Sequence, residues 1–244
     1  MRFKGVSQIV LFNWPFYAFA LVAGLLTWLI KPTLPPTFEV WTELAVLIGA
    51  VSVLLTLLAS WFVYDLRNLY RFDYLSTRSP ERIANIHAGF DETTLALRAK
   101  FPNAVIDIFD FYDPEKHTEA SIRRARARHP AVTGTVAVDS SHIPVGEHTY
   151  DAVFLIFAAH EIRDDVERIA FFKELRLVTK PGANLYVVEH LRDWKNALVY
   201  SIGCLHFHTE TTWRKTFDAS GWELVERNPA NAFVVSYKLQ WKPT

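Results

Sequence analysis

Two long stretches without a charged side chain dominate the first quarter of the chain. Residues 9–30 contain no charged residue over 22 positions, and residues 44–63 contain none over 20. A helix rises about 1.5 Å per residue, so each stretch can cross roughly 30 Å of hydrocarbon. Two such stretches in tandem favour a transmembrane helical hairpin over two buried core helices. A cleaved signal peptide would explain only the first stretch, because a second span follows it.

The residues around the two stretches indicate an orientation. The connector of residues 31–39 is short and rich in proline, and Lys31 is its one basic residue. The basic residues outside the pair are Arg2, Lys4, Arg67 and Arg71. This distribution places both termini, and the domain that follows, on the cytoplasmic side of a two-pass membrane protein. Asn13 and Pro15 predict an irregular start to the first span.

The sequence divides into three parts: a hairpin over residues 1–64, a connector over residues 65–81 and a domain over residues 82–244. Within the connector, Leu66, Leu69, Tyr70 and Tyr74 have helical spacing. They predict a short amphipathic helix on the membrane surface or against the next domain.

Composition excludes some classes of protein. Lys+Arg and Asp+Glu both number 26, so we expect no nucleic-acid partner. The single cysteine, Cys204, excludes an intrachain disulfide and a CxxC zinc site.

Strand and helix patterns alternate through the domain. This alternation predicts an α/β fold with a doubly wound, mostly parallel seven-stranded sheet. The last two strands have no room for a helix between them, so they form a C-terminal antiparallel hairpin. Ligands of such sheets bind beyond the carboxyl ends of the strands. The predicted strands are residues 82–86, 105–109, 135–138, 151–157, 185–188, 222–226 and 233–241. The predicted helices are residues 91–100, 115–129, 164–179 and 211–219.

Residues 149–162 and 177–190, with the turn Lys180-Pro181-Gly182 before an apolar strand, carry a family resemblance. They resemble the second half of class I S-adenosylmethionine-dependent methyltransferases, in the branch that includes quinone-biosynthesis C-methyltransferases. The resemblance covers residues 82 to the C-terminus and leaves the hairpin outside it. It implies S-adenosylmethionine (SAM) as the cofactor.

The resemblance implies cofactor contacts in a turn after the first strand. Gly89 stands where the family has a glycine, and glycine permits close backbone approach to a ligand. His87 and Asp91 replace two other glycines, and Asn85 replaces an acid. His87 marks either a decayed site or a specialised ligand, and the sequence does not decide between them.

The resemblance also implies cofactor contacts at the ends of the next two strands. Asp110 matches the acid that binds the ribose hydroxyls, with Asp107 as a weaker candidate. Asp139 and Ser140 match the residues near the adenine. Ordinary turn chemistry at strand ends is the alternative explanation for both acids.

Two His/Glu pairs follow consecutive predicted strands. His160-Glu161 follow the fourth, and Glu189-His190 follow the fifth. At the carboxyl edge, His160, Glu161 and His190 become candidate catalytic residues, with either histidine as a base. Hydrogen-bonded spacers are the alternative, and a metal-dependent enzyme is a further one. No tight metal-ligand spacing is present, so we predict no metal site.

Residues 194–207 are apolar for a segment beside a substrate site. Three interpretations fit this segment: a lid over a hydrophobic substrate, a third membrane contact or a core helix that packs on the hairpin.

The leading hypothesis is a membrane-anchored methyltransferase. It would transfer a methyl group from SAM to a hydrophobic, membrane-resident quinone, lipid or isoprenoid, with membrane lipid as a partner. The alternative is a non-catalytic membrane subunit that kept the fold and lost the cofactor.

Overall fold

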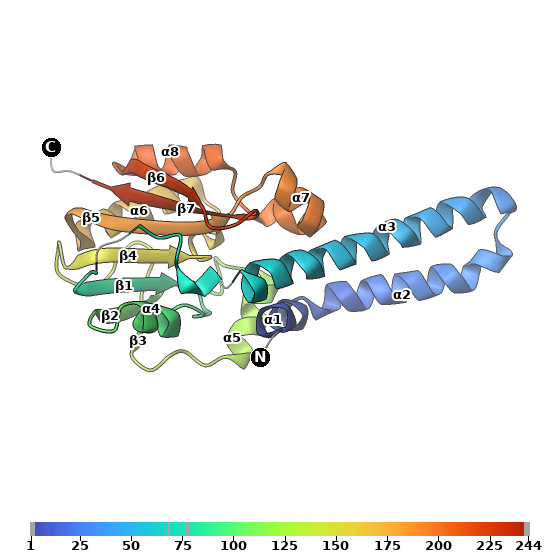
Figure 1. Cartoon of the computed structure of the whole chain (residues 1–244), viewed down its shortest axis with the longest axis horizontal. Helices are drawn as coiled ribbons and strands as arrows, with labels where there is room; N and C mark the ends of the chain where they lie inside the picture. The colour runs from blue at the N-terminus through green and yellow to red at the C-terminus, as the bar shows by residue number, and fades with distance from the viewer. Residues whose placement is uncertain (1–2, 68, 77–78, 242–244) are drawn as a thin grey trace.

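The computed structural model describes residues 3–67, 69–76 and 79–241, and a long helical hairpin extends from one end of an α/β domain (Figure 1). The hairpin consists of α2 (Trp14–Ile30), the short 3-10 helix η1 (Lys31–Thr33) and α3 (Pro36–Ser60). Both helices are long and apolar enough to cross a membrane. α2 has no buried residue and α3 has two at its domain end, so neither is a core helix of this domain.

A separate helix, α1 (Lys4–Phe12), precedes the hairpin, because the first apolar stretch breaks at Asn13 as the sequence predicted. The backbone N–H groups of Gly5 and Val6 donate to the carboxylate of Asp65 at 2.8 and 2.9 Å. Phe12 is buried, with its ring edge-on to Phe90. α1 therefore packs on the α/β domain and does not continue the span.

Seven strands form one sheet in the order β3-β2-β1-β4-β5-β7-β6. The first five are parallel, and β7 is antiparallel to both β5 and β6, as predicted. The carboxyl ends of β1 and β4 point toward the helical hairpin (Figure 1). The strands are β1 (Arg82–His87), β2 (Val105–Asp110), β3 (Thr135–Ala137), β4 (Tyr150–Ile156), β5 (Thr179–His190), β6 (Glu223–Pro229) and β7 (Val234–Gln240).

Helices cover both faces of the sheet, and their ends show how local sequence acts. They are α4 (Thr94–Lys100), α5 (Ala120–Arg128), η4 (Ala159–Glu161), α6 (Asp165–Val178), α7 (Trp194–Tyr200), η5 (Ser201–His206) and α8 (Glu210–Ser220). α8 ends at Gly221, which has φ +79° and therefore suits glycine. α5 begins later than predicted, because Asp113 and His117 form a turn in which the backbone N–H of Asp113 donates to the His117 ring at 2.9 Å.

In the described residues of the connector (65–67, 69–76 and 79–81), the predicted amphipathic helix does not form. A π-helical turn η2 (Trp61–Leu66) ends α3, and a single 3-10 turn η3 (Leu69–Arg71) follows. Phe72 then adopts φ +56°, which ends the helical path. Its side chain is fully buried beside Leu69, in the cluster that covers one face of the sheet. Tertiary packing therefore overrides the helical spacing of this segment.

Candidate functional site

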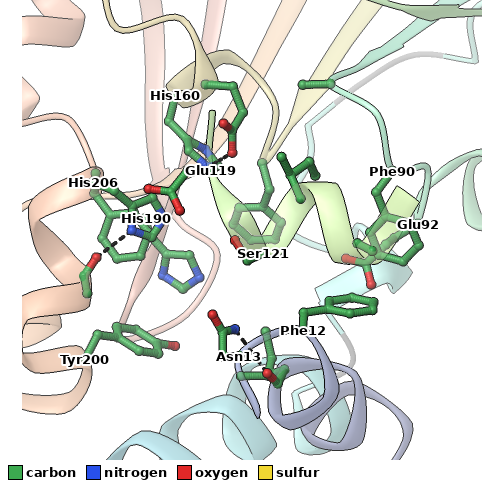
Figure 2. A pocket seen from close by; sticks show the side chains of 18 of the residues that line it. Phe12, Asn13, Phe90, Glu92, Glu119, Ser121, His160, His190, Tyr200 and His206 are labelled. Carbon is green, nitrogen blue, oxygen red and sulfur yellow. Dashed lines mark hydrogen bonds and ion pairs between the residues drawn. The ribbon is translucent and has the colours of Figure 1, made fainter. Parts of the chain in front are cut away.

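A cavity of about 770 Å³ lies beyond the carboxyl ends of β1, β4 and β5. Its floor is built from the turns after these strands, and α1 with the domain ends of α2 and α3 closes the opposite side. Figure 2 shows His160, His190, Tyr200 and His206 on one side of the space, with Phe12 at the end of α1 and the following Asn13 across it. Both the domain and the helical hairpin therefore contribute to its wall.

His160 lies at the centre of a buried group of charges. Its Nδ1 donates to Oε2 of Glu189 at 2.7 Å, and its Nε2 lies 3.4 Å from Oε1 of Glu161. Glu189 is fully buried at the end of β5, whereas Glu161 borders the cavity. The two His/Glu pairs of the sequence thus meet through one imidazole.

The charges around His160 decide its protonation. Burial alone would lower its pKa, but Glu189 and Glu161 together raise the pKa to about 10. Burial would raise the pKa of Glu161, but the hydrogen bond and charge of His160 lower it. At neutral pH His160 is therefore a cation and Glu161 an anion, so Glu161 is the better proton acceptor of the two.

His190 has a different environment. Its ring is stacked between Phe157 and Phe207, with centroids 5.0 and 4.9 Å away. Nδ1 donates to the carbonyl of Phe233 at 3.0 Å, so Nε2 accepts from the hydroxyl of Tyr64 at 3.1 Å. Burial, followed by the charge of His160, lowers its pKa to about 3. His190 lines the cavity as a neutral ring with both nitrogens engaged.

His87 is the least satisfied polar group of the cavity wall. It is 4% exposed, and neither ring nitrogen has a hydrogen-bond partner among the described residues. Its Nδ1 lies 3.7 Å from Oδ1 of Asp110, beyond hydrogen-bond distance. Burial of such a group without a partner is costly, which points to a ligand that completes its bonding.

The predicted ribose-binding acid is held by the protein itself. Oδ1 of Asp110 accepts from the backbone N–H groups of Gly89 and Tyr112 at 2.7 and 3.0 Å. Oδ2 pairs with the guanidinium of Arg126. Gly89 has φ +88°, and a Cβ there would lie 3.0 Å from the Tyr112 ring, so the position needs glycine. The structure brings His87, Gly89 and Asp110 together.

Asn85 and Asp91 serve the turn and do not line the cavity. Oδ1 of Asp91 accepts from the backbone N–H groups of Thr93 and Thr94, both at 2.9 Å. α4 begins at Thr94 with Thr93 as its N-cap, so the helix starts later than predicted and Asp91 lies in the turn before it. The Asn85 amide donates to the two threonine hydroxyls at 2.9 and 2.8 Å. These side chains bind one another and leave His87 as the polar side chain at the end of β1.

Asp139 and Ser140 lie after β3, outside the cavity lining. Asp139 accepts from the backbone N–H and hydroxyl of Ser141 at 2.7 and 2.6 Å. Ser140 donates to Glu167 at 2.5 Å. Nζ of Lys116 lies 3.7 Å from Asp139 and 3.5 Å from Glu167. Lys116 therefore links the predicted adenine-side residues to α6.

Several cavity residues were missed by sequence reasoning. Tyr70 donates to Glu92 at 2.6 Å, and both line the cavity with Tyr64. Phe12 and Asn13 belong to the segment read as a span. Only the break at Asn13 signalled that this helix could turn back over the domain. Among the described residues no group of three or more His, Cys, Asp or Glu side chains is arranged to hold a metal ion.

Comparison with known proteins gives the class of fold. No family model and no curated protein matches the chain. A SAM-dependent methyltransferase from Methanosarcina mazei shares 17% identity at a TM-score of 0.51, over 70% of this chain and 96% of that one. Human N-acetylserotonin methyltransferase, solved with SAM, shares 16% sequence identity at a TM-score of 0.53. The match covers 94% of this chain and 66% of that one. The α/β domain therefore has the fold of SAM-dependent methyltransferases.

A third solved structure separates fold from reaction. The [4+2]-cyclase SpnF shares 13% identity at a TM-score of 0.50, over 73% of this chain and 80% of that one. One scaffold thus supports more than one reaction, so the reaction has to be argued from the site.

Acid is expected to destabilise the folded chain. Burial lowers the pKa of His190 and His208 to about 3 and that of His206 to about 4. These rings are neutral when folded, so stability is lost as pH falls below the unfolded value of about 6.5. Each costs about 1.4 kcal/mol per pH unit, on the order of 4 kcal/mol in all at pH 5.5. His160 offsets part of this loss, because a raised pKa contributes stability that is complete below pH 6.5 and is lost as pH rises from 6.5 to 10. Its contribution grows by about 1.4 kcal/mol between pH 7.5 and 5.5, so the net loss is on the order of 3 kcal/mol.

Thermal unfolding of the full chain in detergent at pH 7.5 and 5.5 measures this effect. The His190→Phe variant keeps the stacked ring and removes one titrating group, so its stability should fall less steeply. Equal stability at the two pH values would contradict the assignment of neutral histidines.

Replacement of His87 tests whether it serves a ligand. If His87 completes its bonding with bound cofactor, His87→Gly should weaken cofactor binding about tenfold, the value of one hydrogen bond of about 1.4 kcal/mol. If the ring merely obstructs the site, the same change should tighten binding. Isothermal titration of both proteins with SAM distinguishes the two outcomes, and we expect weaker binding.

Proposed function

We propose that the chain is a membrane-anchored methyltransferase that transfers a methyl group from SAM to a hydrophobic small molecule of the bilayer. The observation that carries the proposal is the cavity, whose wall joins the carboxyl edge of a methyltransferase-fold sheet to the domain ends of two apolar helices. A quinone, lipid or isoprenoid is the substrate class. The membrane topology has two spans with the domain on the cytoplasmic side.

The apolar surface of the hairpin supports the anchor. The exposed large apolar residues of α2 include Phe19, Leu21 and Trp28, and those of α3 include Val40, Trp41 and Ile48. Side chains of this size, exposed along two adjacent helices, would be unfavourable in water. Lys31 pairs with Glu43 near the turn of the hairpin, where the helices would leave the hydrocarbon.

Residues that would hold the cofactor are present, with one obstruction. Gly89 and Asp110 lie at the turn after β1 and the end of β2, outside the residues that line the cavity. The ring of His87 lines the cavity, and its two nitrogens are buried without a partner among the described residues. Arg126 has to leave Oδ2 of Asp110 before a ribose hydroxyl can bind there. The Arg126 side chain is 43% exposed, so this movement requires no repacking of the core.

The cavity residues supply positioning and proton transfer. SAM supplies an electrophilic methyl group on a sulfonium. Glu161 is ionised and borders the cavity, so it can accept the proton that an acceptor hydroxyl or acidic C–H loses on methylation. His160, held by Glu189, orients the Glu161 carboxylate and balances its charge. The aromatic rings of the wall exclude water and hold an apolar acceptor.

Transfer of radiolabel tests the reaction. Full-length protein in membrane vesicles, given methyl-tritiated SAM and a total lipid extract, should place tritium in chloroform-soluble material. Glu161→Gln should lower the rate by about a hundredfold or more, since it removes the proton acceptor. Glu147→Gln, an exposed carboxylate in a loop, is the control and should retain the rate. Equal rates for wild type and Glu161→Gln would remove Glu161 from the mechanism.

The alternative is a membrane subunit without catalysis. The bond from Arg126 to Asp110 and the replacement of turn glycines by His87 and Asp91 favour it. It predicts that Asp110→Ala leaves cellular function intact in a protein that still folds. A phenotype as severe as gene deletion would argue for the enzyme.

A further inference from the structure

The segment formed by α7 and η5 presents an apolar face to the outside of the domain. Two of its large apolar residues lie on α7 and two on η5, and Ser201, with φ +51°, joins the two short helices. All four are strongly exposed. They are Trp194 at 73% exposed, Leu198 at 61%, Ile202 at 71% and Leu205 at 61%. An exposed apolar face of this kind marks an interaction site.

The opposite side of the same segment is well packed. Asn196, Val199 and Cys204 are buried, as is Phe207 directly after η5. Asp193 begins α7 by accepting from the backbone N–H of Asn196 at 2.8 Å. The exposed face is therefore what remains after the segment has satisfied its packing on the domain.

This face adjoins the hairpin. The hydroxyl of Thr56 in α3 donates to the backbone carbonyl of Val199 in α7 at 2.7 Å. Figure 1 shows α7 at the end of the domain nearest to α3. Leu54 and Leu58, on either side of Thr56 in sequence, are 54% and 49% exposed. The exposed apolar surface of α3 thus reaches the level at which α7 packs on it.

The same segment forms part of the cavity wall. Ile202 and Leu205 of η5 line the cavity, as do Phe16 and Tyr17 at the start of α2. An apolar molecule leaving the surface of α2 would therefore meet apolar cavity wall at these four residues.

We propose that the face of Trp194, Leu198, Ile202 and Leu205 lies in the membrane interface as a third contact with the bilayer. It sets the mouth of the cavity at the level of the lipid. An amphiphile dissolved in the bilayer then enters sideways between η5 and the start of α2, with its polar end toward Glu161. This proposal rests on the membrane anchor proposed above.

The charges beside the face favour lipid over a protein partner. Arg192 and Lys195 are exposed next to Trp194, and Asp193 is committed to the helix cap. A tryptophan with basic neighbours at the edge of an apolar helix face is typical of the level of lipid headgroups. An anionic bilayer would attract this edge while the apolar residues enter the acyl region.

Four positions of equal exposure allow a matched experiment. Ile48 in α3, Leu198 and Leu205 in the proposed face, and Val105 at the amino end of β2 are each 61% exposed. Each is replaced by cysteine in a Cys204→Ser background, labelled with bimane and reconstituted as the full chain. The vesicles contain phosphatidylcholine and phosphatidylglycerol, with tail-brominated phosphatidylcholine as the quencher. SAM binding is measured on every labelled protein.

The proposal expects quenching at Leu198→Cys and Leu205→Cys, at a depth of about 5–10 Å in the headgroup and acyl boundary. Ile48→Cys should be quenched more deeply, and Val105→Cys should not be quenched. If the two face positions behave like Val105 while Ile48 is quenched, the third contact is excluded. Disulfide-linked dimers at Leu198→Cys would assign the face to a second copy and also overturn it. Without quenching at Ile48, the anchor and this contact fail together. Quenching at all three positions without SAM binding would leave the contact standing and remove the enzyme.

Discussion

Replacing Glu189 by glutamine is expected to destabilise the folded chain by about 3–5 kcal/mol, the usual cost of removing one partner of a buried ion pair. Glu189 is fully buried and receives the Nδ1–H of His160 at 2.7 Å, with the backbone N–H of His160 at 3.3 Å from its other oxygen. The change leaves the His160 cation with Glu161 as its remaining carboxylate. The pKa of His160 should therefore fall from about 10, which histidine NMR can follow.

Glu161→Gln is the matched control, because the second carboxylate contacts the same imidazole at 3.4 Å from the cavity side. Glu161→Gln should lower the stability of the fold less than Glu189→Gln does, and it should lower the methyl-transfer rate more. The double variant Glu189→Gln with His160→Gln also removes the cation that has lost its buried carboxylate, so it should be more stable than the sum of the single changes predicts. Additive losses in this cycle would show that the two residues do not act as a pair.

Asp110→Ala is expected to weaken cofactor binding by about tenfold to a hundredfold, because a hydrogen bond to a charged group is worth about 1.5–3 kcal/mol. Arg126→Ala should have the opposite sign. Arg126 pairs with the same Asp110 oxygen that a ribose hydroxyl would use, so its removal should tighten binding. A half-exposed ion pair contributes up to about 1 kcal/mol, which limits the gain to about fivefold.

Arg123→Ala, an exposed arginine on the same helix, is the control for the loss of one positive charge. The affinity of Arg123→Ala for SAM should match that of the wild type in 0.15 M salt. Equal affinity of wild type and Asp110→Ala would show that the end of β2 does not hold the ribose. If Arg126→Ala and Arg123→Ala change affinity alike, the effect is long-range charge and not competition for Asp110.

The sheet could be predicted because its signals are local. The continuous apolar run of β4 indicates a strand buried on both faces, and Lys180-Pro181-Gly182 stops the preceding helix. Gly221 predicted the end of α8. The short connection between the last two strands predicted the antiparallel pair β6–β7. Asp91 does accept from N–H groups close to it in sequence, but the N-cap of α4 is Thr93, two residues after the predicted one.

The site depends on distances between parts that are far apart in sequence. Glu189 reaches His160 because β4 and β5 pair in one register, which places residue 188 beside residue 156. This contact makes His160 a cation, whereas the sequence suggested a histidine base. The roof over the cavity depends on α1 turning back onto α5, with Phe12 against Phe90 and His129. No spacing in the chain encodes that approach.

Direct binding of SAM to the wild-type chain in nanodiscs, measured by isothermal titration, tests the central claim most directly. A methyltransferase with Asp110, Gly89 and His87 in working positions predicts saturable binding of one SAM per chain, tighter in Arg126→Ala and weaker in Asp110→Ala. Folded protein that releases no binding heat at millimolar SAM, in the wild type and in Arg126→Ala alike, would contradict the claim and favour the non-catalytic subunit.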